Sequence, residues 1–279
     1  MPLNRAQVFV SAFVVTTLAF AAGLANAGGV VGPTETDTIG VFNATTRTFF
    51  LRNSNDAGIA DIVVSFGPAG SVPAVGDFDG NGTTTIGVYS ASLGEFFLKN
   101  TNAPGAADTR FRFGPTSSTL PSLIGNWDGV SGDTIGLYSP VNGRFLLRNS
   151  NTAGLPDVET PFGPKNASPA LIPLVGNWSG GDSIDGIGLY NPATGQFLLK
   201  DNPATGGAAD FVFTFGAGGQ GYLPVVGNWD DDDTDNVGLY DPATRTFFLR
   251  TANAGGPADI VVRYGPTNLT PVAGDYDGL

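Results

Sequence analysis

Residues Gly76 to Tyr89 read GDFDGNGTTTIGVY, a run of short acidic and glycine residues followed by a short β-branched segment. Variants recur as GNWDGVSGDTIGLY at 125–138, GNWSGGDSIDGIGLY at 176–190 and GNWDDDDTDNVGLY at 227–240. The last residues, GDYDGL at 274–279, begin another copy, and DTIGVF at 37–42 is the second half of one. Self-similarity at a spacing of roughly fifty residues indicates a repeat architecture, in which no unit buries a core alone.

Each repeat contains four short apolar runs separated by Gly, Pro, Asn and Asp, a pattern typical of β-strands with frequent turns. The first run is expected at 72–75, 120–124, 171–175, 223–226 and 270–273, and the second at 39–42, 86–89, 135–138, 187–190 and 237–240. The third is expected at 48–52, 95–99, 144–148, 196–200 and 246–250, and the fourth at 61–66, 108–113, 157–162, 210–215 and 259–264. We therefore expect an all-β chain.

The order of these runs predicts how the chain closes. A second, a third and a fourth run come first in the chain, and a first run comes last. If the C-terminal strand completes the N-terminal blade, the result is a five-bladed β-propeller of four-stranded blades, and the sheet edges that an open array would leave exposed are removed. The alternative is an open array whose end strands pair with neighbouring molecules.

Composition excludes several classes of function. The formal charge is −12, from 25 acidic and 13 basic residues, which argues against nucleic acid as the partner because nucleic-acid binding requires basic patches. The chain contains no cysteine and no histidine. Disulfides, thiolate or imidazole metal sites, and Ser-His-Asp or Cys-His nucleophile systems are therefore excluded.

The first 27 residues differ in composition from the rest. Arg5 precedes an apolar segment at 6–24, and Ala25-Asn26-Ala27 has the small-x-small form of a cleavage site. This pattern predicts a secretory signal peptide over 1–27, followed by a single propeller domain of about five repeats over 28–279. The alternative is a retained hydrophobic helix, because the apolar segment nearly spans a bilayer. A membrane contact is expected only in that case.

Two of the acidic loops have the spacing of a calcium site. Ca²⁺ takes six to eight oxygen ligands, and a loop of the form Asp-x-Asp-x-Asp/Asn-Gly directs alternate side-chain oxygens at one ion. The loops supply Asp77, Asp79 and Asn81 in one repeat, and Asn228, Asp230, Asp232 and Asp235 in another. The alternative for each loop is a β-turn without metal, since Asn, Asp and Gly dominate such turns.

Other copies match the spacing less well. Asn126 and Asp128 give a partial match to which Asp133 adds a carboxylate, and the turn interpretation weighs at least as much there. At the C-terminal end, Asp275 and Asp277 face the start of the strand at 39–42 if the ring closes. A structural calcium ion bound there would bridge the two ends of the chain.

The combination of GDFDGNGTTTIGVY with the downstream FFLRN segment and the AD-x-x-V-x-x-(F/Y)-GP segment resembles the FG-GAP/VCBS-type β-propeller repeats of integrin α-subunits and secreted bacterial proteins. The resemblance extends over residues 31–278. It implies a propeller with calcium in the loop between the first two strands of a blade, at Asp77, Asp79 and Asn81 and at Asp230 and Asp232. The integrin arrangement has seven blades, so no partner surface is carried over to five.

Three functional hypotheses follow. The first is a secreted or cell-surface, non-catalytic structural and interaction module that contacts a protein or glycan, or self-assembles, with calcium-stabilised loops. The second is a multivalent lectin, because repeated shallow sites gain from multivalency. The third is a glycan-active enzyme using paired carboxylates. Glutamate is rare, being limited to Glu35, Glu95 and Glu159, and Glu159 is the nearest candidate for a non-repeated acid. We therefore favour a non-enzymatic function.

Overall fold

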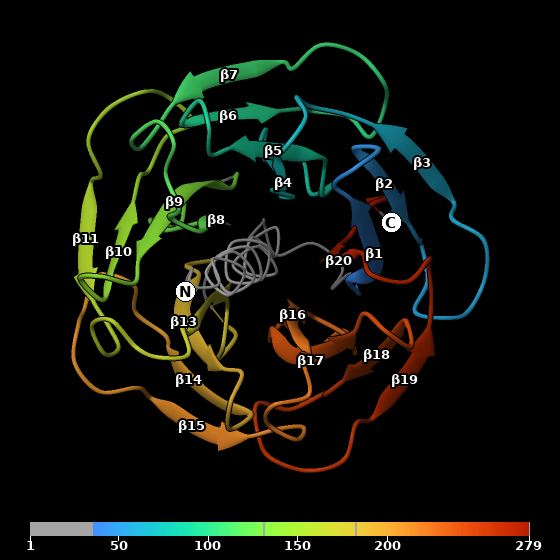
Figure 1. Ribbon diagram of the computed structural model, residues 1–279, viewed down its shortest axis with the longest axis vertical. Helices are drawn as coiled ribbons and strands as arrows, with labels where there is room; N and C mark the ends of the chain where they lie inside the picture. Colours follow the sequence, from blue (N-terminus) through green and yellow to red (C-terminus); the bar gives the residue numbers. More distant parts are fainter. Residues whose placement is uncertain (1–35, 131, 182, 279) are drawn as a thin grey trace, which may run out of the picture.

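The computed structural model describes residues 36–130, 132–181 and 183–278. In this part of the chain there are twenty β-strands and no helix, and the strands form five antiparallel four-stranded sheets. The sheets stand around a common axis as the blades of a closed ring (Figure 1). The all-β class and the five-bladed propeller predicted from the repeats are confirmed.

We number the blades in chain order, each from its innermost strand outward. Blade 1 contains β20 (Thr270–Gly274), β1 (Thr38–Asn43), β2 (Thr48–Leu51) and β3 (Ile62–Ser65). Blade 2 contains β4 (Val72–Pro73), β5 (Gly87–Ser90), β6 (Glu95–Leu98) and β7 (Thr109–Arg112). Blade 3 contains β8 (Ser122–Gly125), β9 (Thr134–Ser139), β10 (Arg144–Leu147) and β11 (Val158–Pro161).

The last two blades follow the same order. Blade 4 contains β12 (Ile172–Gly176), β13 (Gly186–Asn191), β14 (Gln196–Lys200) and β15 (Phe211–Thr214). Blade 5 contains β16 (Leu223–Gly227), β17 (Asn236–Asp241), β18 (Thr246–Leu249) and β19 (Ile260–Arg263). The strands predicted from the apolar runs are all present, with ends that differ by a few residues.

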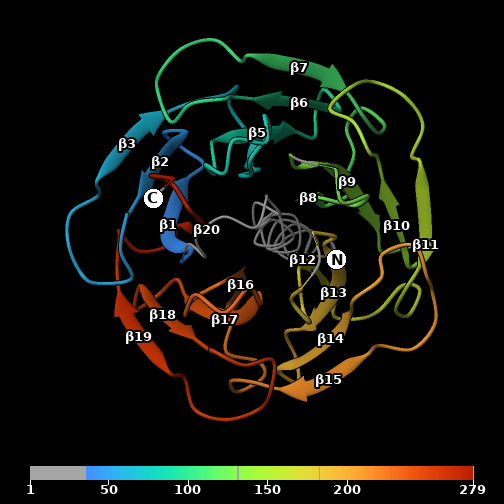
Figure 2. The ribbon, with the colours of Figure 1, turned by 180° about the vertical axis from the view of Figure 1, so that it is seen from behind.

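Blade 1 closes the ring, because its inner strand comes from the far end of the chain. β20 pairs antiparallel with β1, with Thr38 opposite Gly274 and Phe42 opposite Thr270. The Thr38 hydroxyl also bonds the Gly274 carbonyl oxygen at 3.0 Å. Figure 2, from the opposite side, shows β20 between β1 and the axis. The predicted closure is confirmed.

The core repeats from blade to blade because the same residue types face inward. In each blade a ring near the end of the second strand packs against a phenylalanine of the third, with centroids 4.5 to 4.7 Å apart. Such tilted aromatic pairs add stabilisation beyond the buried area. Trp127, Trp178 and Trp229 are buried, and each indole N–H donates to a backbone carbonyl oxygen. These aromatic residues therefore have structural roles.

Alternating strand direction divides the connections between two faces of the ring. The loops after the first and third strands of every blade lie on one face, which we call the loop face. The turns after the second strands and the connections after the fourth strands lie on the other, which we call the turn face. The Asn55 amide of a third-to-fourth loop reaches the Asp37 carbonyl on the loop face. On the turn face, Arg245 reaches the Gly265 carbonyl.

The predicted signal peptide, 1–27, and Glu35 lie outside the described residues. Within the described residues, no helix has the length and apolar character needed to cross a membrane.

Candidate functional site

The acidic loop after each first strand begins with a residue whose side chain holds the loop in shape. Asp77 is buried, and its two carboxylate oxygens accept the backbone N–H groups of Gly80, Asn81 and Gly82 at 2.8 to 3.0 Å. Asp and Asn stabilise turns in this way by accepting N–H groups a few residues further on. The first residue of this loop is therefore a turn-forming residue in its own right.

The equivalent residue does the same in every blade. The Oδ1 atom accepts one or two N–H groups three or four residues ahead, in the pairs Asn126 with Gly129, Asn177 with Gly180, Asn228 with Asp231 and Asp232, and Asp275 with Gly278. Asparagine and aspartate both offer this oxygen. The exchange of Asp for Asn between repeats therefore leaves the turn intact, as the alternative interpretation of these loops requires.

A second acid, placed just before the second strand, crosses to the preceding blade. Asp133 of blade 3 accepts the Asp77 backbone N–H of blade 2 on Oδ2 at 2.8 Å, and its own N–H donates to the Asp77 carbonyl at 2.6 Å. We call this reciprocal pair of hydrogen bonds a clasp. Because it joins the loop of one blade to the strand of the next, it fixes the two blades against each other.

Clasps of the same form join three further pairs of blades. The side-chain bond measures 2.7 to 2.9 Å and the return backbone bond 2.7 to 2.8 Å in Asn126 with Asp185, Asn177 with Asp235, and Asn228 with Asp37. The last of these joins blade 5 to blade 1, so the clasps continue across the closure of the ring.

The junction between blades 1 and 2 departs from this pattern. Its clasp position is Thr84, whose N–H donates to the Asp275 carbonyl at 2.6 Å. A threonine offers no carboxylate for the return bond. The Thr84 hydroxyl is buried, and no hydrogen-bond partner for it lies among the described residues. This junction keeps the backbone half of the clasp.

The clasp explains the invariant glycine that precedes each loop. A Cβ atom added at Gly227 would lie 2.9 Å from Cβ of Asp37, and one added at Gly176 would lie 3.0 Å from Cβ of Asp235. Only glycine lets the neighbouring blade's acid approach this closely. The contact between blades therefore explains why every repeat opens with Gly followed by Asp or Asn.

Burial changes the acidity of one clasp aspartate, Asp37. Removal from water raises the pKa of Asp37 well above its ordinary value, and the carboxylates of Asp235 and Asp275 raise it further. The N–H of Asn228 acts in the opposite direction. Hence acids from blades 1 and 5 lie close enough to interact around the axis.

In two of the loops, an exposed aspartate lies next to another residue of the same predicted calcium-ligand set. Burial raises the pKa of Asp79, and the neighbouring Asp77 carboxylate raises it further. Burial and the Asp232 carboxylate do the same for Asp230. A divalent cation would relieve this repulsion. Each of the two loops therefore brings one pair of carboxylates together.

The fit of the whole predicted ligand set is partial. Asn81 Oδ1 accepts the Thr83 N–H, and the Asp133 and Asp235 carboxylates lie against the preceding blades. Asp128 and Asp277 are exposed. No group of three acidic side chains placed to hold a metal ion occurs in 36–130, 132–181 and 183–278. Backbone carbonyls and water would have to complete a calcium shell around either carboxylate pair.

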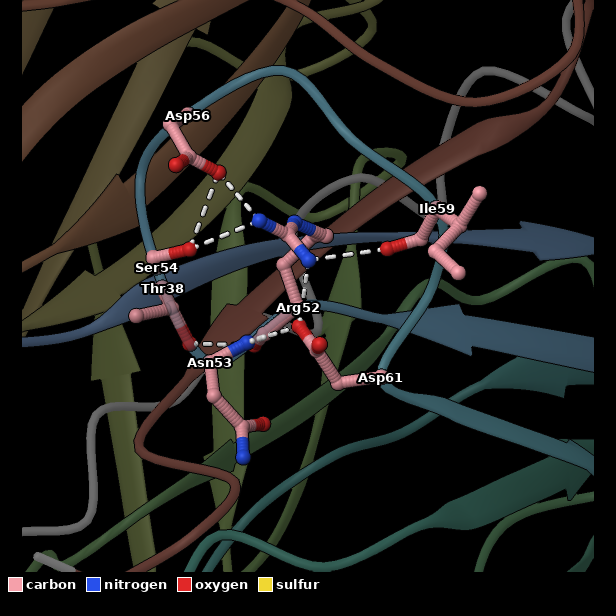
Figure 3. Close-up of polar contacts among 7 residues, drawn as sticks. All are labelled: Thr38, Arg52, Asn53, Ser54, Asp56, Ile59 and Asp61. Atoms are coloured by element: carbon pink, nitrogen blue, oxygen red, sulfur yellow. Dashed lines mark hydrogen bonds and ion pairs between the residues drawn. The ribbon is translucent and has the colours of Figure 1, made fainter.

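The loops between third and fourth strands are organised by a buried cation, which the sequence analysis did not identify. Figure 3 shows Arg52, whose guanidinium reaches Asp61 at 2.6 Å, the Ile59 carbonyl at 2.8 Å, and also Ser54 and Asp56. The Asp61 carboxylate in turn accepts the Asn53 N–H at 2.9 Å. We call this arrangement a pin, because it draws both ends of the loop onto one side chain.

Every blade has a pin, built from the last residue of the third strand region and an aspartate before the fourth. The other pairs are Lys99 with Asp108, Arg148 with Asp157, Lys200 with Asp210, and Arg250 with Asp259, at 2.5 to 3.7 Å. The recurrence of a basic residue and an aspartate in all five repeats is a signal that could have predicted this pairing.

A pocket of about 220 Å³ lies between blades 4 and 5. Its walls include Phe215, Leu239, Pro257 and the rings of Tyr222 and Phe248, whose centroids are 5.9 Å apart. The position of Tyr222 holds Leu171, Leu120, Ser71 and Leu269 in the other blades. The aromatic pair is therefore particular to this junction.

Comparison of the chain with protein-family models, with curated proteins and with solved structures finds no match.

Proposed function

We propose that this chain is a secreted or surface-displayed, non-catalytic propeller that serves as a structural and interaction module, with calcium-stabilised loops. The observation that carries the proposal is the engagement of the repeated acids in turns, clasps and pins, which accounts for their recurrence without catalysis. The resemblance to FG-GAP/VCBS-type repeats points the same way.

The two described glutamates also have non-catalytic surroundings. Glu95 accepts two hydrogen bonds from Arg110, at 2.7 and 3.0 Å. Glu159 is exposed on the outer strand of blade 3. Glycoside hydrolysis by paired carboxylates requires a second carboxylate across a substrate site. Glu95 is instead engaged by Arg110, and Glu159 lies on an outer strand.

Calcium binding is tested by thermal unfolding with excess CaCl₂ and with EDTA. A ligand bound only to the folded state raises the melting temperature with its concentration. We expect a higher melting temperature in calcium, and loss of that increase in Asp79→Asn/Asp230→Asn. The exposed rim variant Glu159→Gln is the matched control. An identical melting temperature in CaCl₂ and EDTA would contradict calcium-stabilised loops.

The interaction role is tested separately, by retention of the purified chain on cells of its source and on immobilised glycans. Binding that saturates supports the module. If the chain binds neither cells nor glycans and does not self-associate, the interaction role is contradicted.

The pocket between blades 4 and 5 favours the lectin as a second candidate, because its half-buried aromatic rings could stack against a sugar ring. Since Tyr222 and Phe248 occur together in one junction only, we propose a single site in place of the multivalent set. A glycan array with the unmodified chain and Tyr222→Leu, which copies blade 4, tests it. Equal binding by both proteins, or none, would remove this candidate.

A further inference from the structure

The propeller separates its charges between its two faces. The acidic first-to-second loops and the pins lie on the loop face, and most of the exposed basic residues lie on the turn face. This separation follows from the repeat itself, because equivalent positions of all blades fall on the same face of a ring.

The loop face is strongly acidic. Its exposed acids are Asp56, Asp61, Asp79, Asp108, Asp128, Asp157, Asp210, Asp230, Asp231, Asp232, Asp233, Asp259 and Asp277. Within the described ranges, the basic residues on this face are the five pin residues, whose side chains are 8 to 15% exposed and lie against their aspartates. The cations of the loop face are therefore turned inward, and the carboxylates outward.

The turn face carries the opposite charge. Arg47, Arg144 and Arg245 lie at the second-to-third turns, and Arg112, Lys165 and Arg263 lie at or just after the fourth strands. All are exposed except Arg245, which is half-buried. Among the described residues, the acids at this face are Asp241, which bonds Thr244, and Glu95, which lies 3.9 Å from Arg112. A net positive face therefore lies opposite a net negative one.

We propose that copies of this chain stack along the propeller axis, with the loop face of one copy against the turn face of the next. Both faces belong to the same ring, so they match in outline, and their charges are complementary. Two loop faces would repel each other. The contact is heterologous, and each added copy presents a new face of each kind, so the product is an open stack. This proposal rests on the interaction role above and names its partner.

Sedimentation velocity of the purified full chain in EDTA, at low and at high salt, tests the stack. We expect a concentration-dependent series of larger species at low ionic strength and monomer in about 0.5 M NaCl, because salt screens charges at a few ångströms. Monomer at low salt over the whole concentration range would overturn the proposal, as would a species that stops at a dimer.

Two matched variants distinguish the effect of the turn face on association from the effect of net charge. Arg47→Gln/Arg144→Gln/Arg263→Gln removes three exposed cations of the turn face. Val63→Glu/Val212→Glu/Val261→Glu makes the same change of net charge on the rim, at side chains 57 to 60% exposed. We expect the first to weaken association on the order of tenfold and the second to retain it. Equal loss in both, or loss only in the rim variant, would overturn the proposal.

A mixing experiment tests the heterologous contact. Asp230→Asn/Asp231→Asn/Asp232→Asn/Asp233→Asn neutralises part of the loop face and leaves the turn face intact. At a concentration near the dissociation constant of the unmodified chain, we expect each of the two variants alone to be mostly monomeric and their mixture to form a one-to-one dimer. Absence of the dimer would overturn the proposal. Retention of surface or glycan binding in the same samples would show that the interaction role stands without the stack.

Discussion

The clasps near the axis and the pins toward the rim use the same acid for different purposes. A clasp aspartate is buried and accepts the backbone N–H of a neighbouring blade, as Asp133 does from Asp77. A pin aspartate is at least one-third exposed and pairs with a cation within its own blade, as Asp157 does with Arg148. One holds the ring together, and the other shapes a loop.

This difference shows that an aspartate repeated at fixed intervals does not by itself mark a metal site. Four of the five junctions have a full clasp, and all five blades have a pin. The burial of the clasp makes each of its bonds costly to leave unmade, whereas solvent weakens the ion pair of the pin. The two sets should therefore respond differently to mutation.

The largest effect is expected from removing the strand that closes the ring. Deletion of residues 270–279 exposes the β1 edge and removes Val272, Ala273 and Tyr276 from the core. We expect the cooperative unfolding transition to be lost and the product to aggregate, because blade 1 loses its innermost strand and so its contacts with both neighbouring blades. Far-UV circular dichroism and light scattering would measure this. A soluble product that still unfolds cooperatively would contradict the closed ring.

A single broken clasp should have the next largest effect. Asp133→Ala leaves the buried Asp77 N–H without its acceptor, and we expect a loss of about 2 kcal/mol in the free energy of unfolding. Asp133→Asn keeps an oxygen acceptor and should lose less. Urea unfolding of the two variants measures the difference. Equal stability of the alanine and asparagine variants would show that the clasp bond contributes nothing.

A pin should be more tolerant. Arg148→Ala removes the donor to the Thr152, Ala153 and Leu155 carbonyl oxygens, and we expect a loss of about 1 kcal/mol. Arg148→Lys should cost less than the alanine variant, because Lys99 and Lys200 fill the same position in blades 2 and 4. The same urea series gives both values. A larger loss for Arg148→Ala than for Asp133→Ala would reverse the ranking of pins and clasps.

The smallest effect is expected from titrating one pin. The Asn100 N–H and then Lys99 hold the pKa of Asp108 below its ordinary value of 3.8. A lowered pKa in the folded state gives stability that is present above the ordinary pKa and lost as pH falls through the folded-state value. Asp108→Asn should therefore flatten the decline of the melting temperature below pH 4. An unchanged decline would assign it to other acids.

The sequence predicted the fold well because the repeat phase is a local property. Alternating apolar runs fix the strands, and their count from Ile39 to Ala273 fixes both blade number and closure. The position of the acids within each loop was also readable. The turn interpretation of these loops predicted the role of Asp77. The calcium interpretation, which grouped Asp77 with Asp79 and Asp230 with Asp232, stays a prediction.

The clasps could not be read in this way. Asp133 lies seven residues after Asn126, yet its carboxylate contacts Asp77, the equivalent residue one blade earlier. That pairing depends on the distance between adjacent blades, which no single repeat encodes. Arg52 and Asp61 were present in the pattern, but their ion pair depends on how the intervening loop folds back.

Blade 1 combines strands from both ends of the chain, and this has a consequence for the rate of folding. Thr38 and Gly274, which share a hydrogen bond, are separated by 236 positions. Blades 2 to 5 can each form as a local meander once their own residues are available, but blade 1 must wait for the last strand to be synthesised. Contacts of such long range slow folding, and an unpaired edge invites aggregation in the meantime. Closure of the ring by β20 is therefore expected to be the slow final step of folding.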